Sequence, residues 1–242
     1  MTSSVPAVDA RPGEERAPVL EGVLLDMDGT LVDTEGLWWT AEATIFAELG
    51  HVLDEAHRAV VVGGPMTRSA SYLIEVTGAD IALDELITRL NTRFAELIGG
   101  SVPLMPGARR LLTELTAHGV PTALVSASHR RIIDQVLLSL GSEHFRLTVA
   151  GDEVERTKPH PDPYLLAAAG LGADPARCVV VEDTVTGVSA AEAAGCPVLA
   201  VPSVVPIEPA PGRTVVPSLE GVDLAFLRAL VKPIDQERAA IP

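Results

Sequence analysis

The stretch Asp26-Met27-Asp28-Gly29-Thr30 directly follows a largely apolar run, residues 19–25. Such a run predicts a buried strand of a parallel sheet, and open α/β sheets bind ligands at the carboxyl ends of their strands. Side chains two residues apart on a strand point the same way, so Asp26 and Asp28 would face one space, and Gly29 permits a sharp turn. One carboxylate could then act as nucleophile or metal ligand and the other as proton donor and acceptor. An ordinary strand followed by an Asp-Gly turn has the same pattern, so the rest of the chain decides.

Length and composition narrow the class of protein. The 242 residues can form one large domain with a smaller insert, and no apolar run is long enough to cross a bilayer. Residues 1–17 resemble no targeting peptide, and we expect them to form a disordered tail. The net charge of −15, from 18 basic and 33 acidic residues, disfavours nucleic acid and anionic membranes as partners. Cys178 and Cys196 have no metal-type spacing, which favours buried free thiols and a cytoplasmic location.

The order of the periodic segments predicts an α/β fold with a parallel sheet. Helices without intervening strands are expected near residues 35–49, 54–62, 67–77 and 83–97. From residue 106, helices (106–118, 130–140, from 162, 185–194 and 224–231) alternate with strands (122–125, 147–150, 178–181 and 198–201). The proline-rich stretch 203–217 is expected to be a surface loop. We therefore expect a core formed by residues 18–35 and 106–242, with residues 36–105 inserted as an α-helical cap over the site.

Polar residues follow two later strands as well. Ser126-Ala127-Ser128 comes after the strand at 122–125 and before a helix, where a hydroxyl and free backbone amides could bind phosphate. A plain helix N-cap is the alternative. Lys158 lies in a loop after the strand at 147–150, and Lys232 is the only other lysine among the 18 basic residues. Since arginine serves elsewhere, a compact positive charge is indicated at Lys158, against the alternative of a solvated surface lysine.

Glu182 and Asp183 end the apolar strand at 178–181. Two adjacent buried acids are costly unless a cation neutralises them, although an acidic helix start would explain them too. Together with Asp26 and Asp28 they supply the oxygen ligands that Mg²⁺ prefers, and Ser126 and Lys158 supply donors to phosphate. The combination predicts a phosphoryl-transfer site for a small-molecule phosphate ester.

These motifs, Asp-x-Asp-Gly-Thr, Ser after a second strand, Lys-Pro, and Glu-Asp with a Gly four residues on, resemble the haloacid dehalogenase superfamily. The likeness covers about residues 19–201 and is closest to the helical-cap branch that contains β-phosphoglucomutase and the sugar-phosphate phosphatases. It implies a Rossmann-like core in which Asp26 attacks phosphorus and forms an aspartyl-phosphate. Asp28 would protonate the leaving oxygen and later deprotonate water.

The same resemblance implies the ligands of the metal and of the phosphoryl group. Mg²⁺ would be held by Asp26, the backbone carbonyl of Asp28, and Asp183, with Glu182 close by. The transferring phosphoryl group would be bound by Ser126, Ala127 and Lys158.

Several residues discriminate among the chemistries of this superfamily. Asp28 argues against dehalogenation, and the absence of lysine from residues 36–105 excludes imine-forming phosphonate hydrolysis. Trp38 stands where β-phosphoglucomutases have a histidine, which favours hydrolysis over mutase activity. Residues 63–68 resemble the specificity loop of related phosphatases, so Arg68 at the end of this stretch is a candidate contact to a sugar hydroxyl or phosphate. An exposed helix-start arginine is the alternative. The run 33–38 resembles phosphatases of 2-deoxyglucose 6-phosphate and hexitol phosphates.

The leading hypothesis is a Mg²⁺-dependent phosphatase of sugar or polyol phosphates, active as a monomer or dimer. A β-phosphoglucomutase-like phosphomutase is the alternative within the enzyme class. A non-catalytic phosphate-responsive binding protein is the alternative outside it, although such a protein does not need the leaving-group acid Asp28.

Overall fold

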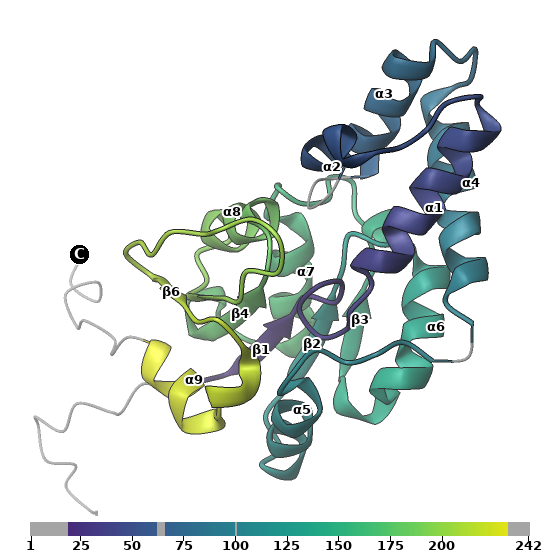
Figure 1. The fold of residues 1–242 in the computed structure, drawn as a ribbon. Coiled ribbons are helices and arrows are strands. Elements are labelled where there is room, and N and C mark those ends of the chain that lie inside the picture. The colour runs from purple at the N-terminus through teal and green to yellow at the C-terminus, as the bar shows by residue number, and fades with distance from the viewer. Residues whose placement is uncertain (1–18, 62–65, 100, 232–242) are drawn as a thin grey trace, which may run out of the picture.

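The computed structural model describes residues 19–61, 66–99 and 101–231, so the predicted tail of residues 1–17 lies outside the described residues. Its centre is a six-stranded sheet with the strand order β3-β2-β1-β4-β5-β6 (Figure 1). All neighbouring strands are parallel. The strands are β1 (Gly22–Leu25), β2 (Thr122–Val125), β3 (Leu147–Val149), β4 (Cys178–Glu182), β5 (Val198–Ala200) and β6 (Arg213–Val215).

Helices cover both faces of the sheet, which confirms the predicted α/β class. The helices that follow β1 before β2 are α1 (Glu35–Glu48), α2 (Glu55–Val61), α3 (Met66–Thr77), α4 (Leu83–Leu97) and α5 (Ala108–Ala117). The later ones are α6 (Arg130–Leu140), α7 (Asp162–Leu171), α8 (Val185–Ala193) and α9 (Leu224–Leu230). None of the helices in the described ranges has the length and apolar character needed to cross a membrane.

Alternation along the strands separates the core into two layers. Val23 and Leu25 of β1 pack with α5, α6 and α9, whereas Leu24 packs with α7 and α8 on the opposite face. β1 and β4 are apolar and buried on both faces, as expected of central parallel strands. Cys178 and Cys196 are buried free thiols, as predicted.

The helices α1 to α4 stand together at one end of the sheet (Figure 1). Their outer part has a hydrophobic cluster of its own, made of Ile45, Phe46, Leu53, Ala70, Leu73, Leu86 and Leu90. The lower part is joined to the main core, because Trp38 of α1 stacks on Phe94 of α4 with ring centroids 3.7 Å apart. The four helices therefore lie above the carboxyl ends of the strands.

The prediction of a loop over residues 203–217 is wrong in one part. Residues Arg213–Val215 form β6, which pairs in parallel with β5 at the edge of the sheet. Arg213 donates to Glu192 of α8 at 2.8 Å, which fastens this edge strand. Three half-buried residues in a proline-rich stretch carry no alternating pattern, so pairing with β5 decides their structure rather than local propensity.

Candidate functional site

The central strands bring the predicted site residues to one edge of the sheet. Asp26 follows β1 directly, and its backbone N–H donates to Val181 of β4 at 3.0 Å. Ser126 follows β2 in the same way, and its N–H donates to Val149 of β3 at 3.0 Å. The sheet ladder thus continues one residue beyond the strands and orders both side chains. Residues more than 90 positions apart in the chain meet because all the strands end on this side.

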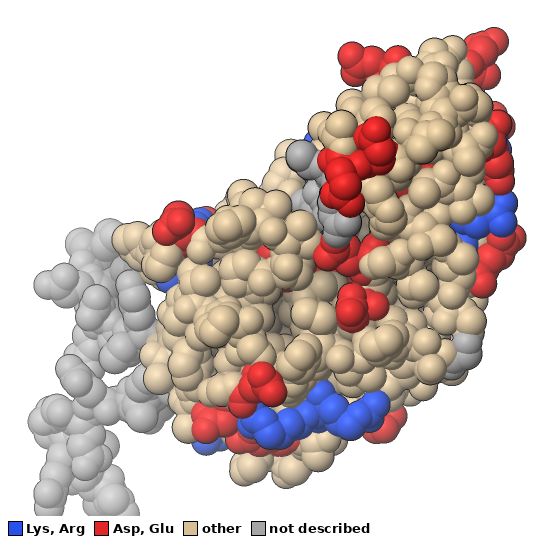
Figure 2. Space-filling model, in the orientation of Figure 1, with Lys and Arg blue, Asp and Glu red and all other residues tan. Residues whose placement is uncertain are grey.

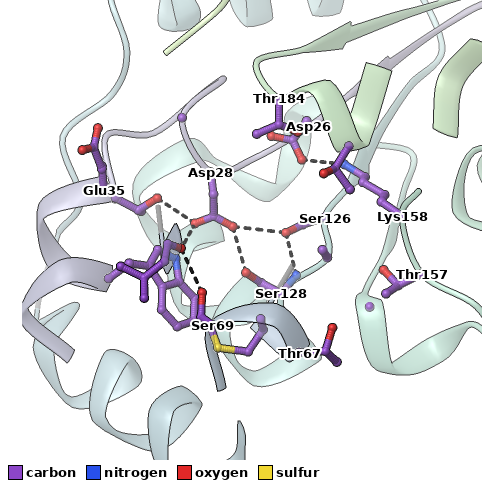
Figure 3. Close-up of a pocket in the computed structure, with 18 of the residues that line it drawn as sticks. Asp26, Asp28, Glu35, Thr67, Ser69, Ser126, Ser128, Thr157, Lys158 and Thr184 are labelled. Carbon is purple, nitrogen blue, oxygen red and sulfur yellow. Dashed lines mark hydrogen bonds and ion pairs between the residues drawn. The ribbon is translucent and has the colours of Figure 1, made fainter. Parts of the chain in front are cut away.

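Lys158 joins two of the predicted acids. Its Nζ donates to Asp26 Oδ1 and Glu182 Oε1, each at 2.6 Å, and to the carbonyl oxygen of Val125 at 2.9 Å. Its side chain is only 4% exposed, so the solvated surface alternative is wrong. Figure 3 shows the lysine reaching Asp26 from the loop beyond β3. All three ammonium hydrogens are used, and this arrangement makes Lys158 the buried counter-charge of the site.

The burial of like charges changes the pKa values of these groups. Burial and the nearby Glu182 raise the pKa of Asp26 to about 7, although Lys158 opposes the shift. Burial and the negative charges of Asp26 and Glu182 raise the pKa of Asp183 well above its usual range. Burial lowers the pKa of Lys158, but Asp26 and Glu182 outweigh it and hold that pKa above its usual value. The site therefore contains more negative charge than one lysine can offset.

Glu182 is held by a dense set of donors. Oε1 accepts from Lys158 and from the hydroxyl of Tyr164 at 2.8 Å, and Oε2 accepts from Asp183 N at 3.0 Å and Thr184 Oγ1 at 3.1 Å. Gly187 leaves room for this carboxylate, because a Cβ there would lie 1.7 Å from Glu182 Oε1. Glu182 is thus a fixed anchor for Lys158 and for the start of α8.

Asp28 is bound from two sides. The hydroxyl of Thr34 and the ring N–H of Trp38 donate to Oδ1 at 2.7 and 3.4 Å. The hydroxyls of Ser126 and Ser128 donate to Oδ2 at 3.2 and 2.8 Å, as Figure 3 shows. The first pair comes from the N-terminal end of α1 and the second from the loop after β2. Asp28 therefore lies where the two parts of the molecule meet.

Asp183 lies against the turn that follows Asp26. Thr30 Oγ1 donates to its Oδ1 at 3.3 Å, and the hydroxyl of Ser203 donates to Oδ2. Gly29 has φ 77°, and a Cβ there would lie 2.2 Å from Asp183 Oδ2. Only glycine fits this turn, since both the backbone angle and the approach of the carboxylate forbid a side chain.

Three carboxylates form the acidic cluster that was predicted for a metal. Asp26, Glu182 and Asp183 each offer an oxygen within 4.8 Å of the others, and all three are buried. Hard oxygen donors in a partly uncompensated acidic site suit a divalent cation such as Mg²⁺. The side chain of Asp28 is turned toward Thr34 and Ser128 rather than into this cluster.

A cavity of about 500 Å³ lies between this edge of the sheet and the helical insert. The sheet side contributes all the core residues predicted for the site: Asp26, Asp28, Ser126, Ala127, Lys158, Glu182 and Asp183. From the insert, Trp38, Trp39 and Glu42 of α1 line it, as do Met66, Thr67 and Ser69 of α3. Arg68 is exposed on α3 and is not among the lining residues, so its contact with substrate stays a prediction.

Sequence reasoning missed several residues of the site. Ser203 follows β5, so the rule of polar residues at strand ends would have found it. Tyr164 has no such signal, because it lies inside an apolar helix and its role depends on the approach of Glu182. Trp38 was noted because it stands where a mutase would have a histidine, and in the structure it both stacks on Phe94 and donates to Asp28.

Comparison with known proteins identifies the class. The model of the family "haloacid dehalogenase-like hydrolase" matches residues 23–201. The chain belongs to this family, as its motifs predicted. The family model and the phosphatase relatives described next indicate, more particularly, a phosphoric monoester hydrolase.

Two curated relatives and one solved structure are informative. A bifunctional riboflavin kinase/FMN phosphatase of Arabidopsis thaliana is 38% identical over 186 residues, which are 75% of this chain and 48% of the relative, so this chain spans about half its length. Hexitol phosphatase B of Escherichia coli K12 is 31% identical, and the match covers 74% of this chain and 82% of that protein. The crystal structure of CbbY from Rhodobacter sphaeroides in complex with phosphate has a TM-score of 0.77 at 28% identity, covering 86% of this chain and 99% of that one.

Proposed function

We propose that this protein is a Mg²⁺-dependent phosphatase that hydrolyses small phosphomonoesters of sugars or polyols through an aspartyl-phosphate on Asp26. The observation that carries the proposal is the buried set of Asp26, Lys158 and Glu182, joined at 2.6 Å and open to a cavity of sugar size. The relatedness to hexitol phosphatase B supports the substrate class.

Asp26 is the proposed nucleophile. It lines the cavity, and Lys158 fixes its Oδ1, so Oδ2 is the oxygen available for attack on phosphorus. A phosphomonoester dianion repels an approaching carboxylate, and the charge of Lys158 offsets part of that repulsion. Ser126 and the backbone amide of Ala127 line the same space and would bind the phosphoryl oxygens.

Asp28 is the proposed general acid and base. Its two oxygens are held by donors from opposite sides, which directs the carboxyl toward the cavity between them. It would give a proton to the leaving oxygen when Asp26 is phosphorylated. It would then take a proton from the water that hydrolyses the aspartyl-phosphate, so the proton inventory balances over one cycle.

Asp26, Asp183 and the backbone carbonyl of Asp28 are the proposed ligands of Mg²⁺, with Glu182 engaged in holding Lys158. The acidic cluster and the raised pKa values of Asp26 and Asp183 fit a cation, because burial leaves their charge uncompensated. When bound, Mg²⁺ would neutralise charge on the transferring phosphoryl group.

We also propose that residues 36–105 act as a cap that excludes water during the reaction, and that the enzyme works in the reducing cytoplasm. Their separate hydrophobic cluster supports a cap, and the two buried free thiols suit a reducing compartment. The phosphomutase alternative gains no support from the site, because Trp38 stands in the place of the mutase histidine and donates to Asp28. The non-catalytic alternative gains no support from it either.

A substrate panel tests the proposal. Purified protein is incubated with sugar, polyol and nucleotide monophosphates, with Mg²⁺ and with EDTA, and released phosphate is measured. We expect Mg²⁺-dependent release from sugar or polyol phosphates and transient acid-stable labelling of the protein by a ³²P substrate. Absence of release from every phosphomonoester would refute the phosphatase, and isomerised sugar phosphate without free phosphate would favour the mutase.

A further inference from the structure

The two walls of the cavity differ in whether a basic residue accompanies their acids. On the sheet wall, the buried positive charge of Lys158 lies among the acids, with His129 nearby. Among the described residues of the cap wall, the charged side chains that line the cavity are all acidic: Glu35, Glu42 and Asp84. Figure 2 shows acidic side chains around the hollow between the two parts, whereas most Lys and Arg visible on that face lie away from it. Among the described residues that line the cap wall, no lysine or arginine would offset a second anion on a substrate.

Glu42 is the unusual member of the cap wall. It is 4% exposed, and burial raises its pKa to about 8, with a hydrogen bond to Ser69 opposing the shift. The hydroxyl of Ser69 donates to the carbonyl of Val61 at 2.9 Å, which fixes Ser69 against the end of α2 beside Glu42. A buried acid costs stability, and no basic residue pairs with Glu42 among the described side chains. Packing therefore gives no reason for an acid here.

Glu42 lies on the same face of α1 as the residues that contact Asp28. Thr34 and Trp38 both donate to Asp28. Glu42 continues the same spacing of four residues, so the three side chains share one face of α1. Four residues advance a helix by about 6 Å. Glu42 thus lies one helical turn farther into the cavity than the contact between Trp38 and Asp28. A leaving alcohol with a short carbon chain is long enough to span that distance. Asn91 of α4 lines the same wall, and its amide donates to Ile87 at 3.0 Å, which leaves its oxygen as an acceptor.

We propose that Glu42, with Ser69 and Asn91, recognises hydroxyl groups at the far end of the leaving alcohol, and that the enzyme therefore selects monophosphates with a neutral, hydroxylated leaving group and rejects those with a second anion. This inference rests on the proposed phosphatase function. A neutral carboxyl offers one donor and one acceptor, which matches a hydroxyl. A second phosphate or a carboxylate would be desolvated beside the acidic side chains of Glu35 and Asp84, a like-charge contact that disfavours binding.

The first test compares substrates that differ by one charged group. We expect wild-type kcat/KM for fructose 1-phosphate to exceed that for fructose 1,6-bisphosphate at least about tenfold, and glycerol 3-phosphate to be preferred over 3-phosphoglycerate in the same direction. Equal kcat/KM within both pairs would overturn the inference while leaving the phosphatase intact. If neither these esters nor p-nitrophenyl phosphate is hydrolysed, the proposed function itself fails.

The second test uses substitutions at Glu42 and a ratio of substrates. Glu42→Leu removes donor and acceptor at similar volume, and we expect kcat/KM for sorbitol 6-phosphate relative to p-nitrophenyl phosphate, which has no hydroxyl, to fall about tenfold. Glu42→Gln keeps a donor and an acceptor and should restore the ratio. Both substrates are measured on one preparation, so a loss of folded enzyme cancels.

An exposed acid of the same cap provides the matched control. Glu85 lies on α4 outside the residues that line the cavity, and Glu85→Gln should leave the ratio as in the wild type. A ratio that Glu42→Leu does not change, or that Glu85→Gln changes equally, would contradict the role of Glu42.

Discussion

The sheet wall and the cap wall of the cavity accommodate buried carboxyl groups in different ways. On the sheet wall, Asp26 and Glu182 are paired with Lys158 at 2.6 Å, and the proposed mechanism uses their charges. On the cap wall, Glu42 has no such partner among the described residues, and burial favours its neutral form. The sheet wall pairs ionised carboxylates with a lysine, whereas the cap wall offers a neutral carboxyl group for hydrogen bonding. Substitutions on the two walls should consequently have effects of opposite sign on stability.

The largest effect is expected at Asp26. Asp26→Asn removes the proposed nucleophile and keeps the shape of the side chain, so phosphate release should fall by at least about 10⁴-fold. Asp33→Asn, the same change at an exposed aspartate seven residues on, should have little effect. Initial rates of phosphate release measure both. Activity of the Asp26 variant comparable to that of the parent would contradict the role of the sheet wall.

The cap wall should become more stable when its acid is removed. Glu42 has a pKa of about 8 in the folded protein against 4.5 as the ordinary value, so the folded state keeps a proton that the unfolded state releases. Stability is then lost as pH rises between these two values, by up to about 5 kcal/mol. Glu42→Leu should remove this loss, and its gain in the free energy of unfolding should grow from about pH 5 to pH 9. Urea denaturation across this range measures the difference; a constant difference would show that Glu42 ionises normally.

The sheet wall should respond in the opposite direction. Lys158→Met leaves Asp26 and Glu182 buried without their counter-charge, and we expect the free energy of unfolding to fall by about 3–5 kcal/mol. Adding Glu182→Gln to this variant removes one of the two unpaired charges and should recover part of the loss. Urea denaturation of the single and double variants checks both statements. A single variant as stable as the parent would mean that the pairing does not stabilise the fold.

A smaller effect is expected from packing at the start of α8. Gly187→Ala places a methyl group on the carboxylate of Glu182, and such overpacking typically costs about 1–3 kcal/mol. Gly36→Ala is the matched control, because it is also a helical glycine and has no atom within 4 Å of the new methyl group. That control should be stabilised by about 0.5–1 kcal/mol. Thermal denaturation of the two variants gives the comparison.

Much of the fold could be predicted from the sequence because its signals are local. The apolar run before Asp26 and the alternation of helices and strands after residue 106 predicted the parallel sheet and the edge at which the site lies. The strand β6 was not predicted, because its three residues lie near prolines and form a strand only through pairing with β5.

The site was predictable where its residues follow strands and less so elsewhere. Ser126 and Glu182 stand at strand ends and Lys158 lies in the loop that follows β3, and all three line the cavity. Tyr164 and Glu42 lie inside helices, where a polar group on a buried face has no pattern of its own. Their surroundings come from contacts between distant segments, which periodicity does not encode.

The separate hydrophobic cluster of the outer cap helices has a consequence for how this enzyme can diversify. Phe46 and Leu73 pack among themselves and their neighbours, not against the sheet that carries Asp26 and Lys158. Mutations can therefore change the wall proposed to meet the leaving group without disturbing the residues proposed for phosphoryl transfer. Substitutions in α1 to α4 can therefore change which phosphorylated alcohol is preferred. New specificities are accessible in small steps from one ancestral protein.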